Sequence, residues 1–94
     1  MKIEVELADQ PLDFIRRQPP ATKRALREVL HDVERGKAFP EPLDDPLDRF
    51  YKLKVSDCRL ILQSVPGRSG PRFRVVFAER RSSVYELFRA LLGL

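Results

Sequence analysis

The chain has 94 residues, of which 43% are hydrophobic and 34% are charged, a composition typical of a single globular domain and not of a disordered chain. No apolar run approaches the roughly 18 residues of a membrane helix, and acidic residues interrupt the first six positions, so we expect no membrane span, no signal peptide and a cytoplasmic location. One cysteine and one histidine exclude an internal disulfide framework and a metal site built from Cys and His ligands, so we expect no metal and no cofactor.

The charge is distributed unevenly along the chain. The net charge is +4, but residues 1–48 hold 8 Lys/Arg against 11 Asp/Glu, whereas residues 49–94 hold 10 against 3. A basic half of this kind is what a phosphate-binding surface requires, because Lys and Arg release counterions when they neutralise phosphates. A generally basic surface without a ligand has the same composition, so charge alone leaves both interpretations open.

The first third of the chain predicts one strand and two helices. Apolar and charged residues alternate from Met1 to Leu7, as in a strand with one buried face. A short helix is expected from Asp9, a potential N-cap, to about Arg17. After Pro19-Pro20, apolar residues at helical spacing predict a second helix that ends at Gly36. The apolar positions expected to be buried by these helices are Leu12, Phe14, Ile15, Leu26, Val29, Leu30 and Val33.

A proline-rich connector follows. Residues 37–48 contain three prolines and four acidic residues, which indicates an ordered segment rather than a flexible linker. We expect Phe39, Leu43 and Leu47 to anchor it by burial. Its acidic residues either restrain the basic surface beside them electrostatically or form a plain surface loop.

Residues 49–62 alternate apolar and basic side chains, pause at Ser56-Asp57, and resume. Because neighbouring side chains of a strand point to opposite faces, this pattern predicts a hairpin with one apolar and one basic face. A two-residue turn fixes its register. The expected facing pairs are Val55 with Cys58, Lys54 with Arg59, Leu53 with Leu60, and Tyr51 with Leu62.

In this register Lys52, Lys54 and Arg59 converge on one face, and Lys54 lies directly opposite Arg59. Like charges that face each other across a ladder destabilise it by some tenths of a kcal/mol. Local conflicts of this kind tend to mark functional sites. The alternative is the solvated face of an ordinary amphipathic strand.

The C-terminal part predicts one more strand and one more helix. A turn is expected over Pro66 to Pro71, and a strand over Arg72 to Ala78 that becomes continuously apolar, as a central strand does. Ser83 begins a capping-box pattern and a last helix, with an apolar stripe of Val84, Leu87, Phe88, Leu91 and Leu92. The order is therefore β-α-α-β-β-β-α, an α+β fold with a mainly antiparallel sheet, with helices on one face and the other face available.

The hairpin F-Y-K-L-K-V-S-D-C-R-L-I-L-Q and the tail V-V-F-A-E-R-R-S-S-V-Y-E-L-F resemble the RelE/ParE superfamily of toxins from bacterial type II toxin–antitoxin systems. The resemblance covers nearly the whole chain and is nearer to the RelE branch, whose members are ribosome-dependent ribonucleases that cut messenger RNA in the decoding site. It implies one RelE-like toxin domain over residues 1–94. It also implies a metal-independent mRNA interferase, an endoribonuclease that inhibits translation.

The resemblance also implies roles for individual residues. Lys52, Lys54 and Arg59 match basic active-site residues of the RelE branch, Tyr85 matches its C-terminal tyrosine, and Arg81 matches an arginine of the tail motif. All five are expected to be catalytic. Neighbouring arginines expected to bind RNA are Arg49, Arg74 and Arg80.

One position departs from the pattern. The RelE branch often has a further catalytic arginine six residues before the tyrosine, where this chain has Glu79. Arg80 is the next residue and substitutes for that arginine only if the backbone or its rotamer compensates. Glu79 therefore weighs against the ribonuclease interpretation.

The chemistry agrees with these residue types. Attack of a 2′-OH on its own phosphate requires removal of its proton, stabilisation of phosphoryl charge, and a proton for the departing 5′ oxygen. Lys52, Lys54 and Arg59 supply the electrostatic part, commonly the largest. Tyrosine is a poor base unless cations favour its phenolate, so Tyr85 is either an assisted base or an orienting and stacking residue, with a lysine of the cluster as the base.

Three functions remain open from the sequence. The first is a RelE-like mRNA endonuclease; the second is a ParE-like inhibitor of DNA gyrase; the third is a non-catalytic module that binds RNA or an antitoxin. Under the first two, the resemblance implies a cognate antitoxin, whose acidic segment would fold over the basic face or against the apolar side of the last helix.

Overall fold

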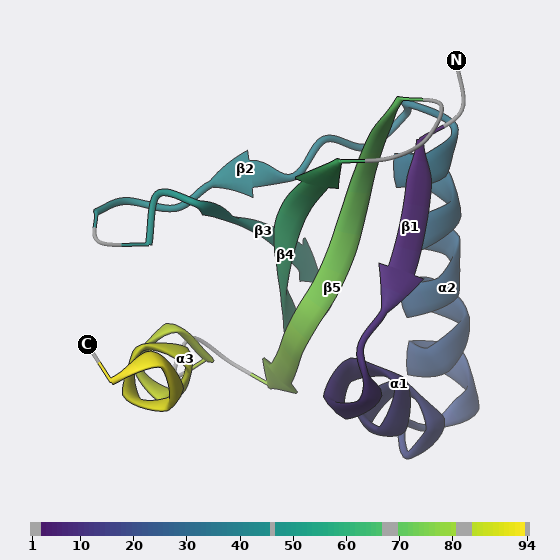
Figure 1. The fold of residues 1–94 in the computed structure, drawn as a ribbon. Coiled ribbons are helices and arrows are strands. Elements are labelled where there is room, and N and C mark those ends of the chain that lie inside the picture. Colours follow the sequence, from purple (N-terminus) through teal and green to yellow (C-terminus); the bar gives the residue numbers. More distant parts are fainter. Residues whose placement is uncertain (1–2, 46, 67–69, 81–83, 94) are drawn as a thin grey trace.

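The computed structural model describes residues 3–45, 47–66, 70–80 and 84–93. Its elements are β1 (Glu4–Leu7), α1 (Asp9–Arg16), α2 (Pro20–Glu34), β2 (Glu41–Pro42), β3 (Phe50–Val55), β4 (Cys58–Pro66), β5 (Pro71–Arg80) and α3 (Val84–Leu92) (Figure 1). The strands form one sheet in the order β1-β5-β4-β3-β2, in which β1 and β5 are parallel and the other neighbours antiparallel. The predicted α+β fold is confirmed, and the two-residue strand β2 is an addition to it. Within the described residues, no helix is long and apolar enough to cross a membrane.

The ends of α1 and α2 show why the chain breaks where it does. α1 begins after Ala8 without a side-chain cap, so the expected capping bond of Asp9 is absent. α2 begins at Pro20, where a missing N–H costs nothing. It ends in a Schellman motif at Gly36, whose φ of 73° requires the left-handed region. The N–H of Gly36 donates to Val33 at 3.1 Å and that of Lys37 to Asp32 at 2.7 Å.

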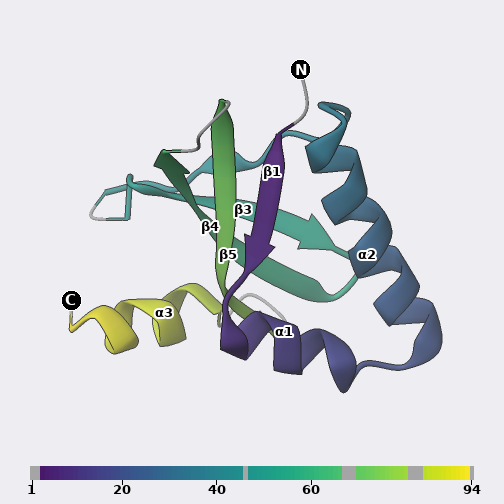
Figure 2. The ribbon, with the colours of Figure 1, turned by 45° about the vertical axis from the view of Figure 1, so that its right-hand side comes forward.

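A side chain extends the pairing of β1 with β5. β1 ends at Leu7, and the N–H of Ala8 donates to the carbonyl of Val75. Gln10 then continues the pattern from the first turn of α1: its Nε2 donates to the carbonyl of Ala78 at 2.7 Å, and its Oε1 accepts the N–H of Ala78 at 2.8 Å. At this point the chain has already turned from β1 into α1 beside β5 (Figure 2). The amide thus takes the place of a β1 partner for two backbone groups of β5.

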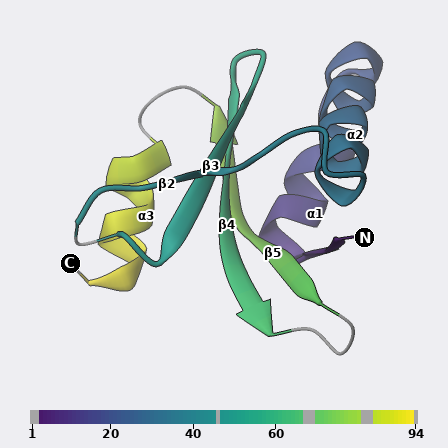
Figure 3. The same cartoon turned by 90° about the horizontal axis from the view of Figure 1, so that it is seen from above.

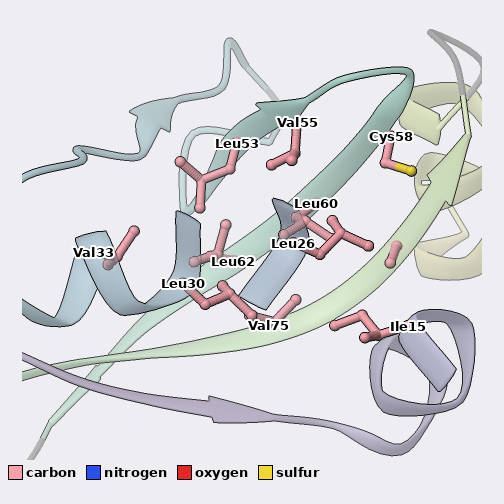
Figure 4. Close-up of a cluster of buried hydrophobic side chains, with 11 residues drawn as sticks. Ile15, Leu26, Leu30, Val33, Leu53, Val55, Cys58, Leu60, Leu62 and Val75 are labelled. Carbon is pink, nitrogen blue, oxygen red and sulfur yellow. The ribbon is translucent and has the colours of Figure 1, made fainter. Parts of the chain in front are cut away.

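The main core lies between the sheet and the first two helices. Ile15 of α1 and Leu26, Leu30 and Val33 of α2 point toward apolar side chains of the sheet (Figure 4). Those sheet residues include both halves of the predicted hairpin face: Leu53, Val55, Cys58, Leu60 and Leu62. The apolar face of the hairpin was therefore predicted correctly.

The expectation that the helices share one face holds for α1 and α2 and is wrong for α3. Viewed along the sheet, α3 lies on the opposite side from α1 and α2 (Figure 3). There Phe88 packs on Ile61 and Phe77 in a second cluster. The physical reason is that β4 is central and buries Leu60, Ile61 and Leu62 completely, so both of its faces need apolar cover.

A β-bulge in β5 sets which side chains reach each face. Between Ile61 and Leu62 of β4 the register shifts, so that Ile61 faces Phe77 while Leu62 faces Val75. Val76 is the extra residue, and alternation along β5 restarts after it. As a consequence Phe77 and Glu79 lie on the α3 face, although Val75, two residues earlier, lies in the main core.

Candidate functional site

The hairpin forms in the predicted register. Lys54 pairs with Arg59 and Val55 with Cys58 across a two-residue turn. Ser56, the first turn residue, has a φ of 56°, as the first position of a II′ turn requires. Because facing residues of an antiparallel pair project to the same side, Lys52, Lys54 and Arg59 share the α3 face of the sheet.

These three cations line one cleft together with Tyr85. The cleft has a volume of about 470 Å³ and lies along the edge of β3 that β2 leaves uncovered, since β2 pairs only with Tyr51 and Lys52. Its lining residues are Val29, Ala38, Phe39, Glu41, Lys52, Leu53, Lys54, Arg59 and Tyr85. Four of the five residues expected to be catalytic are thereby brought together from β3, β4 and α3. The fifth, Arg81, lies outside the described residues.

Packing of α3 brings Tyr85 to this cleft. Phe88, three residues further along the helix, makes edge-on contact with Phe50 at a centroid distance of 4.8 Å and lies 5.8 Å from Phe77. Residues three apart share a helix face, so the anchored Phe88 holds Tyr85 against the sheet. Tyr85 is half-buried and its ring centroid lies 6.0 Å from Lys52 Nζ, which is the outer range of a cation–π contact.

The three cations differ in their partners. Lys52 Nζ lies 4.0 Å from Glu41 Oε2. Arg59 Nη1 donates to the carbonyls of Cys58 at 2.9 Å and Ser56 at 3.3 Å, which fixes the guanidinium over the turn. Lys54 is exposed, and among the described residues no carboxylate lies within 4.0 Å of it. Lys54 is therefore the cation most available to an anionic ligand.

Glu79 lies on the α3 face of the sheet, with the three cations, whereas Arg80 does not. Glu79 pairs with Arg59 across β4 and β5, and Arg80 pairs with Cys58, whose side chain lies in the main core. Arg80 accordingly projects to the α1 side, where its Nη2 and Nε donate to Gln18 Oε1 at 2.8 and 3.3 Å. The structure does not place Arg80 in the cleft or in the position of the missing arginine.

Arg49 and Arg74, both expected to bind RNA, do not line the cleft. Arg74 lies on the α3 face but beyond the apolar row of Ile61 and Phe77, and its Nε forms an ion pair with Glu6 at 3.5 Å. Arg49 is exposed just before β3.

The acidic connector forms a neighbouring cleft of about 390 Å³ that shares Lys52 and Tyr85 and includes Asp44, Asp45 and Arg89.

The sequence interpretation missed Phe39. It was expected to be an anchor like Leu47, which is indeed buried, but its side chain is 73% exposed and lines the basic cleft. The one sequence signal was the position of this phenylalanine, between the end of a helix and a proline in a polar segment.

Among the described residues, no three His, Cys, Asp or Glu side chains gather as they would around a metal ion.

Cys58 is buried and lies outside the cleft. Burial raises the pKa of its thiol, and the neighbouring Asp57 carboxylate raises that pKa further. The thiol donates to Asp57 Oδ1 at 3.6 Å. Cys58 is therefore a protonated packing residue at neutral pH.

Comparison with known proteins finds the same fold in solved toxin structures. No family model and no curated sequence matches the chain. A mutant of the Escherichia coli toxin RelE in the free state has a TM-score of 0.72 at 15% identity, covering 100% of this chain and 99% of that one. The isolated Escherichia coli RelE toxin gives 0.64 at 19% identity over 95% and 97%.

A third structure, the YoeB/ParE toxin from Agrobacterium tumefaciens, has a TM-score of 0.59 at 18% identity, covering 86% of this chain and 99% of that one. Both RelE structures score higher than this one. At the level of the fold, the predicted resemblance is confirmed. The chain has the fold of the RelE and YoeB/ParE toxins over essentially their whole length.

Proposed function

We propose that this protein is the toxin of a type II toxin–antitoxin system and a ribosome-dependent mRNA endonuclease of the RelE kind, acting in the cytoplasm. One observation carries the proposal: Lys52, Lys54, Arg59 and Tyr85 line a single cleft. These residues come from three elements, and they are the ones that the RelE resemblance selects. The shared fold supports the same function.

The proposed reaction is intramolecular transesterification. The 2′ oxygen forms a bond to the adjacent phosphorus, and the bond from that phosphorus to the 5′ oxygen breaks, which yields a 2′,3′-cyclic phosphate and a 5′-OH. Lys54 and Arg59 stabilise charge on the phosphoryl oxygens, the contribution that is commonly largest. Arg59 is held by two carbonyls, so its remaining N–H groups are oriented before RNA binds.

Lys52 and Tyr85 act beside the phosphate. The Tyr85 ring orients a nucleotide by stacking. A lysine of the cluster, in its neutral amine form, takes the 2′-OH proton, and a neighbouring protonated side chain of the site gives a proton to the departing 5′ oxygen. Since Lys52 lies near Glu41 and the Tyr85 ring, its position is better defined than that of Lys54. Arg81 is proposed to contribute from the tail, as the resemblance implies.

An antitoxin is the proposed partner. α3 presents Leu87, Leu91 and Leu92 to solvent, and the three cations of the basic cleft lie on the same face of the sheet as α3. An acidic, initially disordered segment of the antitoxin would cover both, burying the leucines and neutralising the cations.

Induced expression without antitoxin tests the proposal against the ParE alternative. An mRNA endonuclease stops protein synthesis first, measured as incorporation of a labelled amino acid, while DNA stays intact. Early DNA damage with continued translation would instead support a gyrase inhibitor. A folded product with no effect on growth would support the non-catalytic module.

A further inference from the structure

We propose that Phe39 is a stacking platform for a base of the RNA strand bound in the basic cleft. This inference rests on the proposed function and adds a base-stacking residue to it. The ring belongs to the segment between α2 and β2, separate from the cationic hairpin and from α3. It therefore gives the cleft a second aromatic wall besides Tyr85.

The exposure of Phe39 is the first observation. Its side chain is 73% exposed, and the other large apolar residues found exposed in the described part of the chain are leucines of α3. Leaving a phenyl ring in water forfeits the hydrophobic stabilisation that its burial would contribute. The ring lines the same cleft as Lys54, Arg59 and Tyr85, so an occupant of that cleft would cover it.

The second observation is that the backbone on both sides of Phe39 is fixed. The N–H of Ala38 donates to Asp32 at 3.2 Å, which ties the preceding residue to the end of α2. On the other side, Glu41 pairs with Lys52 of β3. Pro40 follows directly and confines Phe39 to extended conformations. The backbone that carries the ring is thus preorganised, which lowers the entropic cost of binding.

Chemistry selects RNA as the occupant. A single-stranded nucleic acid combines anionic phosphates with flat bases, and proteins that bind it combine cations with aromatic rings. The cleft has both, and Glu41, the one carboxylate among its described lining residues, lies 4.0 Å from Lys52 Nζ. With a phosphate at Lys54 and Arg59, one flanking base meets Tyr85 and another meets Phe39.

The test compares rings with an aliphatic side chain of similar size. A short single-stranded RNA containing 2-aminopurine, whose fluorescence is quenched by stacking, is titrated with the protein at low salt. We expect Phe39→Ala and Phe39→Leu to weaken binding about 5- to 150-fold, the range of stacking per base converted to affinity, and to reduce quenching to the part that Tyr85 supplies. Phe39→Tyr and Phe39→Trp should retain both.

Two further measurements separate loss of stacking from other causes of weaker binding: the salt dependence of RNA affinity reports phosphate contacts, and urea unfolding reports the fold. The slope of log affinity against log salt reports phosphate contacts, so it should be unchanged in Phe39→Leu and reduced in Lys54→Gln. Because the Phe39 side chain is exposed, the Phe39 variants should also unfold at the wild-type urea concentration. Full affinity in Phe39→Leu would overturn the inference, as would absence of RNA binding by the wild type.

The outcome is distinguishable from failure of the proposed function. If the wild type cuts ribosome-bound message and Phe39→Ala cuts it equally fast, the stacking role is wrong and the endonuclease remains. If ring-dependent RNA binding occurs without cleavage, the endonuclease is wrong and the platform remains. An effect of Phe39→Ala on antitoxin binding alone would assign the ring to the protein partner and overturn the inference.

Discussion

Arg59 and Glu79 lie directly opposite each other on β4 and β5, yet each side chain bonds to nearby backbone. Arg59 donates to the carbonyls of Ser56 and Cys58, and Glu79 accepts the N–H of Arg80 at 2.9 Å. Among the described residues, no ion pair within 4.0 Å joins the two side chains. A negative charge therefore stands on the same face as the cations proposed to hold phosphate.

Replacing Glu79 should strengthen RNA binding. Glu79→Gln removes a repulsion of the phosphate, and Glu79→Arg adds an attraction. The affinity for RNA should therefore rise from the wild type to Glu79→Gln and again to Glu79→Arg. For a single strand, one added phosphate contact steepens the salt dependence by about 0.7. Salt titrations of RNA binding measure both effects. Unchanged affinity in Glu79→Arg would show that this position does not face the bound strand.

Lys54→Gln should lose activity without losing stability. Lys54 faces Arg59, so removing its charge relieves a like-charge pair and should stabilise the fold by a few tenths of a kcal/mol. Cleavage should fall by about 10²–10³, the usual cost of one electrostatic donor. Urea denaturation and cleavage rates provide the two measurements. If this variant is less stable than the wild type, the repulsion between Lys54 and Arg59 does not destabilise the fold, and the interpretation of this pair as a functional feature is contradicted.

Gln10→Ala should destabilise the fold substantially. The substitution leaves the N–H and carbonyl of Ala78 without the amide that bonds both, and an unsatisfied buried group costs about 1–3 kcal/mol. Urea unfolding should show this loss, and hydrogen exchange at Ala78 should accelerate. Gln18→Ala is the matched control, because it loses two exposed bonds from Arg80 and one to the carbonyl of Phe14 in its own chain segment, and this loss should cost about 1 kcal/mol or less.

Cys58 should make stability fall at high pH. Its pKa is raised by burial and by Asp57, so above about pH 9 the unfolded thiol ionises while the folded thiol remains protonated. The unfolded state then binds fewer protons, and stability decreases as pH rises toward the folded pKa. Unfolding free energies at pH 8 and pH 10 should differ more in the wild type than in Cys58→Ala. If the unfolding free energy changes equally in the wild type and in Cys58→Ala, the pKa of the Cys58 thiol is not raised in the folded protein.

Local patterns predicted the hairpin and the helix ends well. Alternation on both sides of Ser56-Asp57 fixed the pairing of Lys54 with Arg59 because a one-residue slip would expose the apolar face. Gly36 marked the end of α2 because it alone adopts the required φ there without strain. Both features depend on neighbours in the sequence.

The site required tertiary information that no local pattern carries. Simple alternation from Arg74 would place Arg80 on the α3 face of the sheet. Because of the bulge at Val76, Glu79 lies on that face instead. The position of α3 depends on Phe88 meeting Ile61 and Phe77. Phe39 was misassigned because a phenylalanine in a loop is more often an anchor than an exposed ring.

The most direct test is primer-extension mapping of message cleavage on programmed ribosomes with purified protein. The wild type should cut the message within the ribosomal decoding site. Lys54→Ala should cut it at least about 100-fold more slowly, and Arg24→Ala, which removes an exposed cation of α2 outside the cleft, should cut at the wild-type rate. Absence of cleavage by the folded wild type, or equal rates for all three proteins, would contradict the proposal that the basic cleft cuts RNA.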